Sequence, residues 1–464
     1  MLINGNMPLW FRPAELHHFN WLFSVAPCFA VHSSKINIIT DPRIFYDTLC
    51  ERFRKADKRI SVASLYIGTG ILERRLLDIT KETVHTKNLK FNVLLDYQRG
   101  TRGEENSRTL LQDFLDEMPT QCIVSLYQTP RLQGSWSKAL PSRYNELVGL
   151  QHMKLYIADD TVLLSGANCS TDYFQQRQDR YIEIEDPDIA DFYSELIEEV
   201  SAFSKKCERG GSVKGFQRKL TKDMMMNVVN MRMRDFTEKW KAQQGSNYYK
   251  VFGDLNKDTW VFPLIQMGEF GIRQDEQATL SLLSSAPEGS CIRLATGYFN
   301  LTEQYASALL KDCNANVSLL MAHPNANGFL GAAGPAGGIP HAYSLIAQQF
   351  KKKIEDLDQS ERIRMFEYQR PGWTFHAKGL WYYPPGSNVP WGTIVGSANL
   401  GERSVRRDLE AQAVIFTSSP ELQMRLHDEC AELHKYGTEC NKELQERQVP
   451  LWVRATVGLF RTYF

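Results

Sequence analysis

The stretch "QHMKLYIADDTVLLSGANCS" (151–170) decides the fold. It carries His152, then Lys154 and Asp159, and it ends in a turn of small residues that holds Asn168. The apolar residues around the first three are typical of a buried strand. Because alternate residues of a strand lie on one face, we expect His152 and Lys154 to point the same way.

A second copy lies in "FHAKGLWYYPPGSNVPWGTIVGSANL" (375–400). His376 and Lys378 repeat the pair, Asn399 repeats the turn, and Tyr383 stands where the first copy has an aspartate. The second copy is therefore incomplete at that one position. The histidine, the lysine and the asparagine are kept, which indicates that both copies serve one purpose.

The triplet His-x-Lys alone carries little weight, since His85-Thr86-Lys87 has the same spacing and no such turn behind it. The two long copies differ from it by a carboxylate that follows each asparagine at the same spacing. That carboxylate is Asp179 in the first copy and Glu410 in the second. We therefore interpret the repeated set as functional, in preference to two unrelated core histidines.

The repeat extends beyond these motifs. "KRISVASLYIGTG" (58–70) has an echo in "SCIRLATGYFNLT" (290–302), and "FNVLLDYQRG" (91–100) has one in "NVSLLMAHPN" (316–325). Each is an apolar strand that ends in a polar or small-residue loop, with a helical segment before the first strand. This order predicts an α/β fold of two halves related by a pseudo-twofold axis, each a mixed sheet flanked by helices. One composite active site should lie between the halves.

These patterns divide the chain into five parts. Residues 36–205 and 252–440 are the predicted halves. Residues 206–251 are rich in Lys and Arg and predict a helical insertion without strands. Residues 1–35 are rich in aromatic side chains, and residues 441–464 predict an amphipathic tail.

Composition limits the function classes. The 464 residues carry 54 Lys and Arg against 54 Asp and Glu, so net charge gives no reason to expect nucleic acid. The nine cysteines contain no Cys-x-x-Cys, which favours reduced thiols. No apolar run is long enough for a membrane span.

The repeated residues suit attack on a phosphodiester. One imidazole can act as the nucleophile toward phosphorus, and the other can protonate the leaving oxygen and later deprotonate the acceptor. Two lysines and two asparagine amides can hold the charged oxygens of the transition state, and a carboxylate can fix each imidazole tautomer. This scheme requires no metal, and no cluster has the spacing of metal ligands. The predicted catalytic residues are His152, Lys154, Asp159, Asn168, Asp179, His376, Lys378, Asn399 and Glu410.

The doubled motif resembles that of the phospholipase D superfamily, whose members share two α/β halves and one composite site. Tyr383 in place of the second aspartate, and Asp179 in place of a glutamate, depart from the family pattern. These departures leave open which carboxylate orients which histidine. His152 lies in the complete motif, so we expect it to be the nucleophile, with the reverse assignment as the alternative.

Longer segments are similar to the family of eukaryotic mitochondrial phosphatidylglycerophosphate synthases. They include "LLDYQRGTRGEENSRTLL", "LQHMKLYIADDTVLLSGANCSTDYF", "RQDRYIEI" and "SVRRDLEAQ". The resemblance implies transfer of a phosphatidyl group from CDP-diacylglycerol to glycerol 3-phosphate, the first committed step of cardiolipin synthesis. It also implies a peripheral enzyme on the matrix side of the mitochondrial inner membrane. No cofactor is then required, although a divalent cation can stimulate the reaction through the pyrophosphate.

Four residues are predicted to bind these phosphate-rich substrates. Arg99 and Arg102 follow a strand, at the place where α/β folds bind ligands, and Tyr66 and Tyr298 occupy matching positions of the repeat. The alternatives are two surface arginines and two tyrosines of the core.

Three segments are candidates for contact with an anionic membrane surface: residues 7–31, the Gly-rich loop 327–339 with Phe329 and Leu330, and the tail 449–464 with Trp452, Phe460 and Phe464. Ordinary packing or a contact between copies of the chain is the alternative for each, and the oligomeric state stays open. For the whole chain, a phospholipase D-type hydrolase or nuclease and an inactive lipid-binding scaffold remain as alternatives to the transferase.

Overall fold

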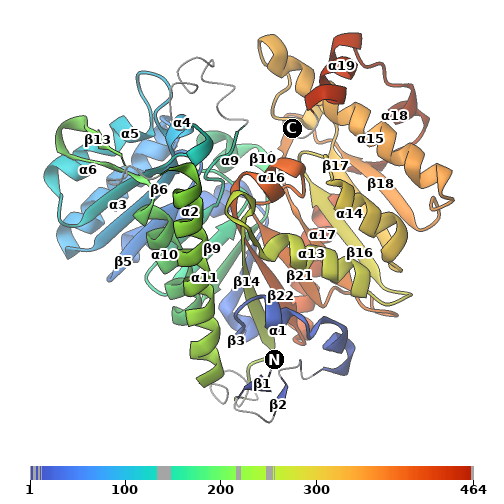
Figure 1. The fold of residues 1–464 in the computed structure, drawn as a ribbon, viewed down its shortest axis with the longest axis horizontal. Coiled ribbons are helices and arrows are strands. Elements are labelled where there is room, and N and C mark those ends of the chain that lie inside the picture. Colours follow the sequence, from blue (N-terminus) through green and yellow to red (C-terminus); the bar gives the residue numbers. More distant parts are fainter. Residues whose placement is uncertain are drawn as a thin grey trace.

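The computed structural model describes residues 2–3, 7–8, 11, 13–132, 148–215, 221–246, 254 and 256–460. Two α/β halves lie side by side, the first coloured blue to green and the second yellow to red (Figure 1). Strands β1 (Leu2–Ile3) and β2 (Met7–Pro8) lie below their junction, and α19 (Leu451–Phe460) lies above the second half. Each half contains a mixed sheet with helices against it, as the repeat predicts.

The first sheet has the strand order β13-β12-β7-β6-β5-β8-β9-β11-β4. Strands β5, β6 and β7 are parallel, and the neighbours from β8 to β4 are antiparallel. The bounds are β4 (Ile36–Ile39), β5 (Arg59–Ala63), β6 (Lys90–Asp96), β7 (Cys122–Tyr127), β8 (Leu155–Ala158), β9 (Thr161–Ser165), β11 (Tyr181–Glu185), β12 (Lys205–Cys207) and β13 (Val213–Lys214).

The second sheet has the order β15-β14-β22-β21-β20-β16-β17-β18-β23. Read from the other end, the run from β18 to β14 repeats the run from β7 to β4, with the same parallel and antiparallel neighbours. The duplication inferred from sequence is therefore confirmed in the topology. The bounds are β14 (Thr259–Met267), β15 (Ile272–Arg273), β16 (Cys291–Thr296), β17 (Asn316–Ala322), β18 (Ile363–Tyr368), β20 (Gly379–Tyr383), β21 (Gly392–Gly396), β22 (Leu409–Thr417) and β23 (Gly437–Glu439).

The helices begin where the sequence provides caps. Asp41 accepts the backbone N–H of Arg43 at the start of α2, and Pro42 occupies its first turn. Asp186 and Ser419 cap α10 and α17 in the same way, whereas α3 and α15 begin without a side-chain cap. The bounds are α1 (Leu22–Val25), α2 (Pro42–Lys55), α3 (Ile71–Lys87), α4 (Tyr97–Gly100), α5 (Ser107–Leu110), α6 (Gln112–Glu117), α9 (Thr171–Gln175), α10 (Pro187–Ala202), α11 (Lys222–Ser246), α13 (Gln274–Ser285), α14 (Glu303–Ser307), α15 (Ile339–Asp356), α16 (Glu402–Arg406), α17 (Pro420–His434), α18 (Lys442–Glu446) and α19 (Leu451–Phe460).

The core has three layers. One lies between the first sheet and helices α2, α3 and α6, and another lies between the second sheet and helices α13 to α15. The central layer joins side chains of both sheets, among them Val162, Ile182, Val395 and Ala413. Because this layer is shared, the two halves are packed into one body, and burial of its apolar surface holds the seam together.

The N-terminal aromatic segment belongs to the core. Phe11, Phe19 and Phe23 are buried against Phe262 and Phe416 of the second sheet. Strand β3 (Phe29–Val31) continues the segment and pairs with β14. The prediction that these rings meet a membrane is therefore wrong, because the second sheet already buries them. Strands β1 (Leu2–Ile3) and β2 (Met7–Pro8) precede the segment.

The basic segment 206–251 contains the long helix α11 (Lys222–Ser246), which lies in front of the first half near the junction in Figure 1 and contacts α10 of the first half and β15 of the second. It also contains β13, which pairs with β12 at the edge of the first sheet. The prediction that this segment carries no strand is therefore wrong, and the first half reaches at least to Lys214.

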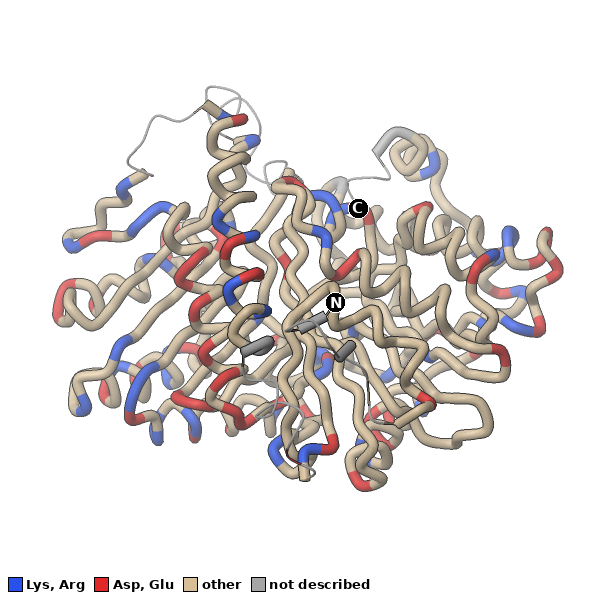
Figure 2. Tube along the Cα trace, turned by 60° about the horizontal axis from the view of Figure 1, so that its bottom comes forward, with Lys and Arg blue, Asp and Glu red and all other residues tan. Residues whose placement is uncertain are grey.

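Positive and negative residues alternate over both halves in Figure 2, so neither half carries a stripe of one sign along its trace. The nine cysteines are free thiols, eight of them buried. Among the described helices, none combines the length and the apolar character that a membrane crossing requires.

Candidate active site

The two histidines lie where the halves are joined by backbone hydrogen bonds. The N–H of His376 donates to the carbonyl of Gln178 at 2.8 Å, beside the parallel pair of β10 (Arg177–Gln178) and β19 (Thr374–Phe375). In the same way, the N–H of His152 donates to the carbonyl of Leu409 at 2.9 Å. Each histidine is therefore attached to the residue that precedes the carboxylate of the opposite half.

Each histidine is also hydrogen-bonded to the carboxylate of the opposite half. Both carboxylate oxygens of Glu410 lie 3.0 Å from Nδ1 of His152, and Asp179 Oδ2 lies 2.6 Å from Nδ1 of His376. With Nδ1 held by an acid, Nε2 is the nitrogen that each ring offers to a substrate.

The lysines are buried beside their own histidines. Lys154 Nζ donates to the carbonyl of His152 at 2.7 Å, and Lys378 Nζ donates to that of His376 at 2.6 Å. Lys378 Nζ also lies 3.7 Å from Asp179 Oδ2. Gly166 makes this approach possible, because a Cβ there would lie 2.7 Å from Lys378 Nζ.

Burial sets the protonation of the site. Burial and the adjacent Lys154 charge lower the pKa of His152 well below its usual value, and burial and Lys378 do the same for His376. Burial also lowers the pKa of Lys378 to about 8 and raises the pKa of Asp179 and of Glu410. Burial therefore favours the neutral form of both imidazoles. A neutral ring is the form that can attack phosphorus, whereas the ring that acts as the acid must bind a proton before the first step.

The asparagines and Tyr173 complete this set. Asn168 Nδ2 donates to the Tyr173 hydroxyl at 3.1 Å, and that hydroxyl lies 3.4 Å from Nε2 of His376. The buried Oδ1 atoms of Asn168 and Asn399 have no hydrogen-bond partner among the described residues. Such groups are rare in folded proteins unless a ligand or water satisfies them.

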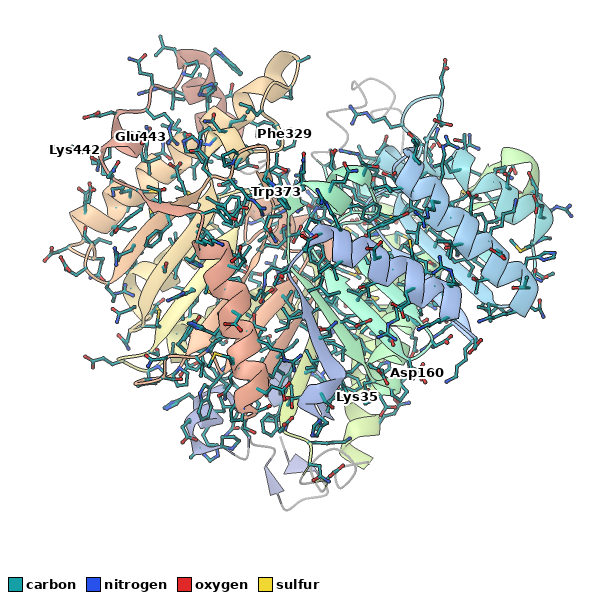
Figure 3. The ribbon with its side chains drawn as sticks, turned by 180° about the vertical axis from the view of Figure 1, so that it is seen from behind. Lys35, Asp160, Phe329, Trp373, Lys442 and Glu443 are labelled. Atoms are coloured by element: carbon teal, nitrogen blue, oxygen red, sulfur yellow. The ribbon has the colours of Figure 1, made fainter. Side chains whose placement is uncertain are left out.

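Asp159 lies outside this set. Its carboxylate accepts the backbone N–H groups of Asp57, Lys58 and Arg59, and its own φ is +53° in the short turn between β8 and β9. Figure 3 places its neighbour Asp160 far from Phe329 and Trp373, which lie above the seam. The prediction that Asp159 is catalytic is therefore wrong, and its role is structural. Asp159 follows the last residue of β8, whereas His152 precedes the first.

The role of Asp159 in a tight turn also explains why the second copy has Tyr383 at that position. In the second half, β20 and β21 are joined by residues 384–391 instead of a two-residue turn, and the left-handed position of that loop is occupied by Gly386. The incomplete second motif therefore leaves the histidine pair intact.

The predicted substrate-binding residues divide into two groups. The Tyr298 ring lies 5.4 Å from that of His376, centroid to centroid. The Tyr66 hydroxyl lies 3.3 Å from Ser170 Oγ, and the Arg99 guanidinium lies 4.7 Å from the Tyr66 ring centroid. Arg102 is exposed and farther along the same loop. The structure thus brings Tyr298 to the histidine pair, and Tyr66 and Arg99 to its rim.

Two further residues beside His376, Tyr173 and Arg177, were not predicted. Their signal in the sequence is only nearness to Asn168 and Asp179, on the short helix α9 and strand β10 between them.

One group of potential metal ligands lies in this region: His152, Asp408 and Glu410. Its donor atoms already have partners. Asp408 accepts from Arg403 Nε at 2.8 Å and from the N–H of Leu150 at 3.0 Å, while Glu410 holds His152. These residues fit an ion-pair network, and the stimulation by a divalent cation stays a prediction.

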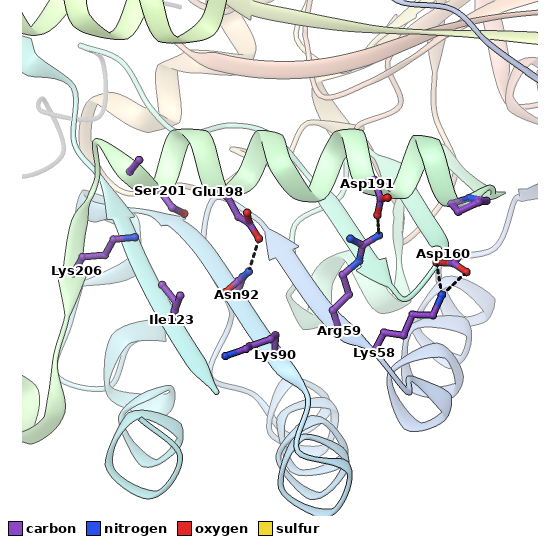
Figure 4. A pocket seen from close by; sticks show the side chains of 12 residues that line it. Lys58, Arg59, Lys90, Asn92, Ile123, Asp160, Asp191, Glu198, Ser201 and Lys206 are labelled. Carbon is purple, nitrogen blue, oxygen red and sulfur yellow. Dashed lines mark hydrogen bonds and ion pairs between the residues drawn. The ribbon is translucent and has the colours of Figure 1, made fainter. Parts of the chain in front are cut away.

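A groove of about 780 Å³ lies elsewhere, between the first sheet and α10 (Figure 4). Its charged residues are largely paired with each other, Lys58 with Asp160 and Arg59 with Asp191. It starts at the amino ends of β5 and β6, whereas the histidines lie toward their carboxyl ends. We assign it no part in the chemistry.

The site can be compared with known proteins. Residues 49–201 match the family model "Cardiolipin synthase, PLD-like domain". The chain is 40% identical to "CDP-diacylglycerol--glycerol-3-phosphate 3-phosphatidyltransferase, mitochondrial" of Homo sapiens, covering 98% of this chain and 88% of the relative. The relative of that name from Gallus gallus is 39% identical, over 99% and 88%. A relative from Schizosaccharomyces pombe, of the same name without the compartment, is 31% identical over 94% and 96%.

A solved structure shares the fold. Phosphatidylserine synthase of Haemophilus influenzae Rd KW20 superposes with a TM-score of 0.70, covering 97% of both chains at 19% identity. At that identity the likeness concerns the fold alone, and it agrees with two phospholipase D-like halves.

Proposed function

This chain belongs to the family of CDP-diacylglycerol–glycerol-3-phosphate 3-phosphatidyltransferases, and we propose that it carries out the reaction for which those relatives are named. CDP-diacylglycerol and glycerol 3-phosphate would give phosphatidylglycerophosphate and CMP. The observation that carries the proposal is the reciprocal pairing of His152 with Glu410 and of His376 with Asp179 across one buried seam.

In the first step, Nε2 of His152 attacks the phosphatidyl phosphorus. The bond from phosphorus to the CMP oxygen breaks, and His376 gives its proton to CMP. In the second step, the hydroxyl of glycerol 3-phosphate attacks the same phosphorus and passes its proton to His376. The bond from phosphorus to His152 then breaks, and the imidazole is restored.

The surrounding residues stabilise charge. Lys154 and Lys378 lie beside the reacting rings and can bind the phosphate oxygens. The Nδ2 groups of Asn168 and Asn399 are further donors, whereas their unpartnered Oδ1 atoms can only accept a hydrogen bond, as from a substrate hydroxyl. The carboxylates hold each ring and support the imidazolium that forms. No step requires a metal or a cofactor.

The lipid substrate needs a route from a bilayer, and two segments support one. Trp452 on α19 contacts the start of α15, because a Cβ on Gly338 would lie 2.1 Å from its ring. Leu451 is 84% exposed, Trp452 51% and Leu330, in the loop before α15, 58%. Phe329 of that loop contacts Tyr298 at 5.7 Å between centroids, so the exposed surface continues to the site.

We therefore propose that α19 and the loop 327–339 rest on an anionic membrane surface. Rings and aliphatic side chains beside cations suit such a surface. The other face of α19 is fixed to the protein, since Val453 and Val457 are buried. Arg461 and Phe464 lie outside the described residues, as does the side chain of Phe460. Two of the relatives are named mitochondrial, and we propose the matrix side of the inner membrane for this chain.

The test is CMP release from CDP-diacylglycerol in detergent micelles, with and without glycerol 3-phosphate. Release that depends on glycerol 3-phosphate, with formation of phosphatidylglycerophosphate, is expected. Release that ignores it would make the chain a hydrolase, and no release would make it a scaffold. His152→Ala serves as the control for contaminating activity.

A further inference from the structure

Arg177 is a buried cation beside His376, and the acid whose charge acts on it, Asp179, is hydrogen-bonded to His376. Its side chain is 9% exposed, and no ion pair among the described residues includes it. Its Nε has no hydrogen-bond partner in that part of the chain. An arginine does not lose its charge in a protein, so its burial without an ion-pair partner is costly.

The tyrosines around His376 hold this cation in place. The Arg177 guanidinium lies 4.6 Å from the Tyr173 ring centroid, and its Nη2 donates to the Tyr298 hydroxyl at 2.7 Å. Both rings lie against His376, with centroids 5.1 Å and 5.4 Å away. A Cβ on Gly328 would lie 2.5 Å from Nη1, so a larger residue there would displace the guanidinium from this position.

The opposite half has the reverse charge at the matching position. Arg177 precedes Asp179 by two residues, and Asp408 precedes Glu410 by two. Asp408 is neutralised by Arg403 on the side of His152. The seam is therefore asymmetric: the unpaired positive charge lies on the side of His376.

We propose that Arg177, with the hydroxyls of Tyr173 and Tyr298, is the receptor for a phosphate monoester. The guanidinium fork matches phosphate oxygens, and the hydroxyls are further donors. The inference rests on the proposed function, which supplies two such groups: CMP leaving and glycerol 3-phosphate arriving. Both must use the side of the phosphorus opposite to His152, because the acceptor enters along the path by which the leaving group departs.

A bound dianion has a further effect. The Arg177 charge contributes to lowering the pKa of His376. A phosphate on Arg177 offsets that charge and raises the pKa of His376. In the first step this phosphate is the CMP phosphate of bound CDP-diacylglycerol, and it favours the protonated acid. In the second step it is glycerol 3-phosphate, and it makes His376 a stronger base. Binding of a phosphate at Arg177 is thereby coupled to the protonation of His376.

Binding can be measured without turnover by titrating CMP or glycerol 3-phosphate alone into the whole chain in a calorimeter. Cytidine and glycerol are the matched probes without phosphate. The variants are Arg177→Gln and Arg177→Lys, with Arg364→Gln as the control, since Arg364 is an exposed arginine paired with Glu439 far from the seam. Thermal melts report whether each variant folds.

Arg177→Gln should weaken the affinity for at least one of the two phosphates by about 10- to 100-fold. Arg177→Lys should lose less, and Arg364→Gln nothing. A loss with CMP alone assigns the receptor to the leaving group, a loss with glycerol 3-phosphate alone assigns it to the acceptor, and a loss with both is the result expected.

Unchanged affinity for both phosphates in folded Arg177→Gln would overturn the receptor and leave Arg177 as a structural residue. A wild-type chain that binds neither phosphate would overturn it as well. These outcomes differ from failure of the proposed function, in which the wild-type chain shows no glycerol 3-phosphate-dependent CMP release while the binding comparison still stands.

Discussion

Asp179 Oδ2 lies 2.6 Å from Nδ1 of His376, although the two residues belong to opposite halves of the chain. Glu410 holds His152 by the same exchange. Neither half thus contains a complete histidine–carboxylate pair. The active unit is the seam itself, which explains why the shared central core must join the two sheets before any chemistry is available.

The exchange predicts different defects for the two carboxylates. Glu410→Gln should slow attachment of the lipid to the protein, because it removes the acid that orients the expected nucleophile. Asp179→Asn should slow transfer of the lipid to glycerol 3-phosphate more than its attachment to the protein, because Asp179 orients His376. Each should reduce turnover by at least about 100-fold, as loss of an orienting carboxylate does elsewhere. Quenched-flow measurement of CMP and of protein-bound lipid separates the two steps, and identical step profiles would contradict the exchange.

Asp159→Ala should destabilise the fold without a specific loss of catalysis. Its carboxylate accepts three backbone N–H groups at the turn, so we expect a loss of roughly 1–3 kcal/mol in the free energy of unfolding. Activity per folded molecule should stay within about twofold at a temperature where the variant is folded. Denaturant titration and an active-site-normalised assay test this, and a large fall in kcat with unchanged stability would return Asp159 to the site.

Sequence alone predicts the duplication well, because strand order and motif spacing are local properties that both halves repeat. Each lysine lies beside its own histidine, as the spacing of two residues predicts, but His152–Lys154 and His376–Lys378 precede strands β8 and β20 and do not lie in them. The partners of the carboxylates do not, since spacing along the chain says nothing about which half will lie opposite. The prediction for Asp159 was wrong because, in a sequence, an aspartate that a turn requires looks the same as a catalytic aspartate.

The aromatic residues of the N-terminal segment show a second limit. Phe11 and Phe19 have the composition of a membrane-contacting segment, yet the second sheet presents the apolar face that buries them. Composition records that a side chain avoids water, and only the tertiary structure decides whether protein or lipid replaces the water.

The roles of the histidines are separable by trapping. We expect His376→Ala to accumulate a phosphatidyl group on His152 after brief exposure to CDP-diacylglycerol, because CMP leaves fairly well without an acid whereas the acceptor hydroxyl needs a base. His152→Ala should form no adduct. Mass spectrometry of the intact protein and its peptides provides the measurement. An adduct on His376 in the second variant would reverse the roles, and none in either would indicate direct transfer.

Asp275 predicts an unusual pH dependence of stability. It is fully buried, Gln412 donates to it, and burial raises its pKa to about 7. Since the folded pKa exceeds the unfolded value of about 3.9, the folded chain binds the extra proton, and this residue's contribution to stability falls as pH rises from about 4 to 7. Asp275→Asn should therefore gain stability relative to wild type across that window, by on the order of 4 kcal/mol at most.

Comparing the two chains at each pH removes the opposite slope of the buried histidines. Their lowered pKa values cost stability as pH falls below about 6.5, and they are present in both proteins. Denaturant midpoints at several pH values between 5 and 8 provide the measurement. A constant difference between variant and wild type would show that Asp275 does not titrate in this range.

The exposed side chains of α19 should govern membrane binding. Leu451→Ser with Trp452→Ser removes apolar area that the protein leaves in water, while Val453 and Val457 keep the helix attached to α15. We expect partition onto vesicles of phosphatidylglycerol and phosphatidylcholine to fall about 10-fold or more, since each lost side chain removes on the order of 1–2 kcal/mol of transfer energy. Activity on short-chain substrate below its critical micelle concentration should stay unchanged, because neither residue reaches the histidines.

Met424→Ser is the matched control, since Met424 is an exposed apolar residue on α17, 50% accessible. Equal partition of the double variant, the control and the wild type would place the membrane contact on another surface.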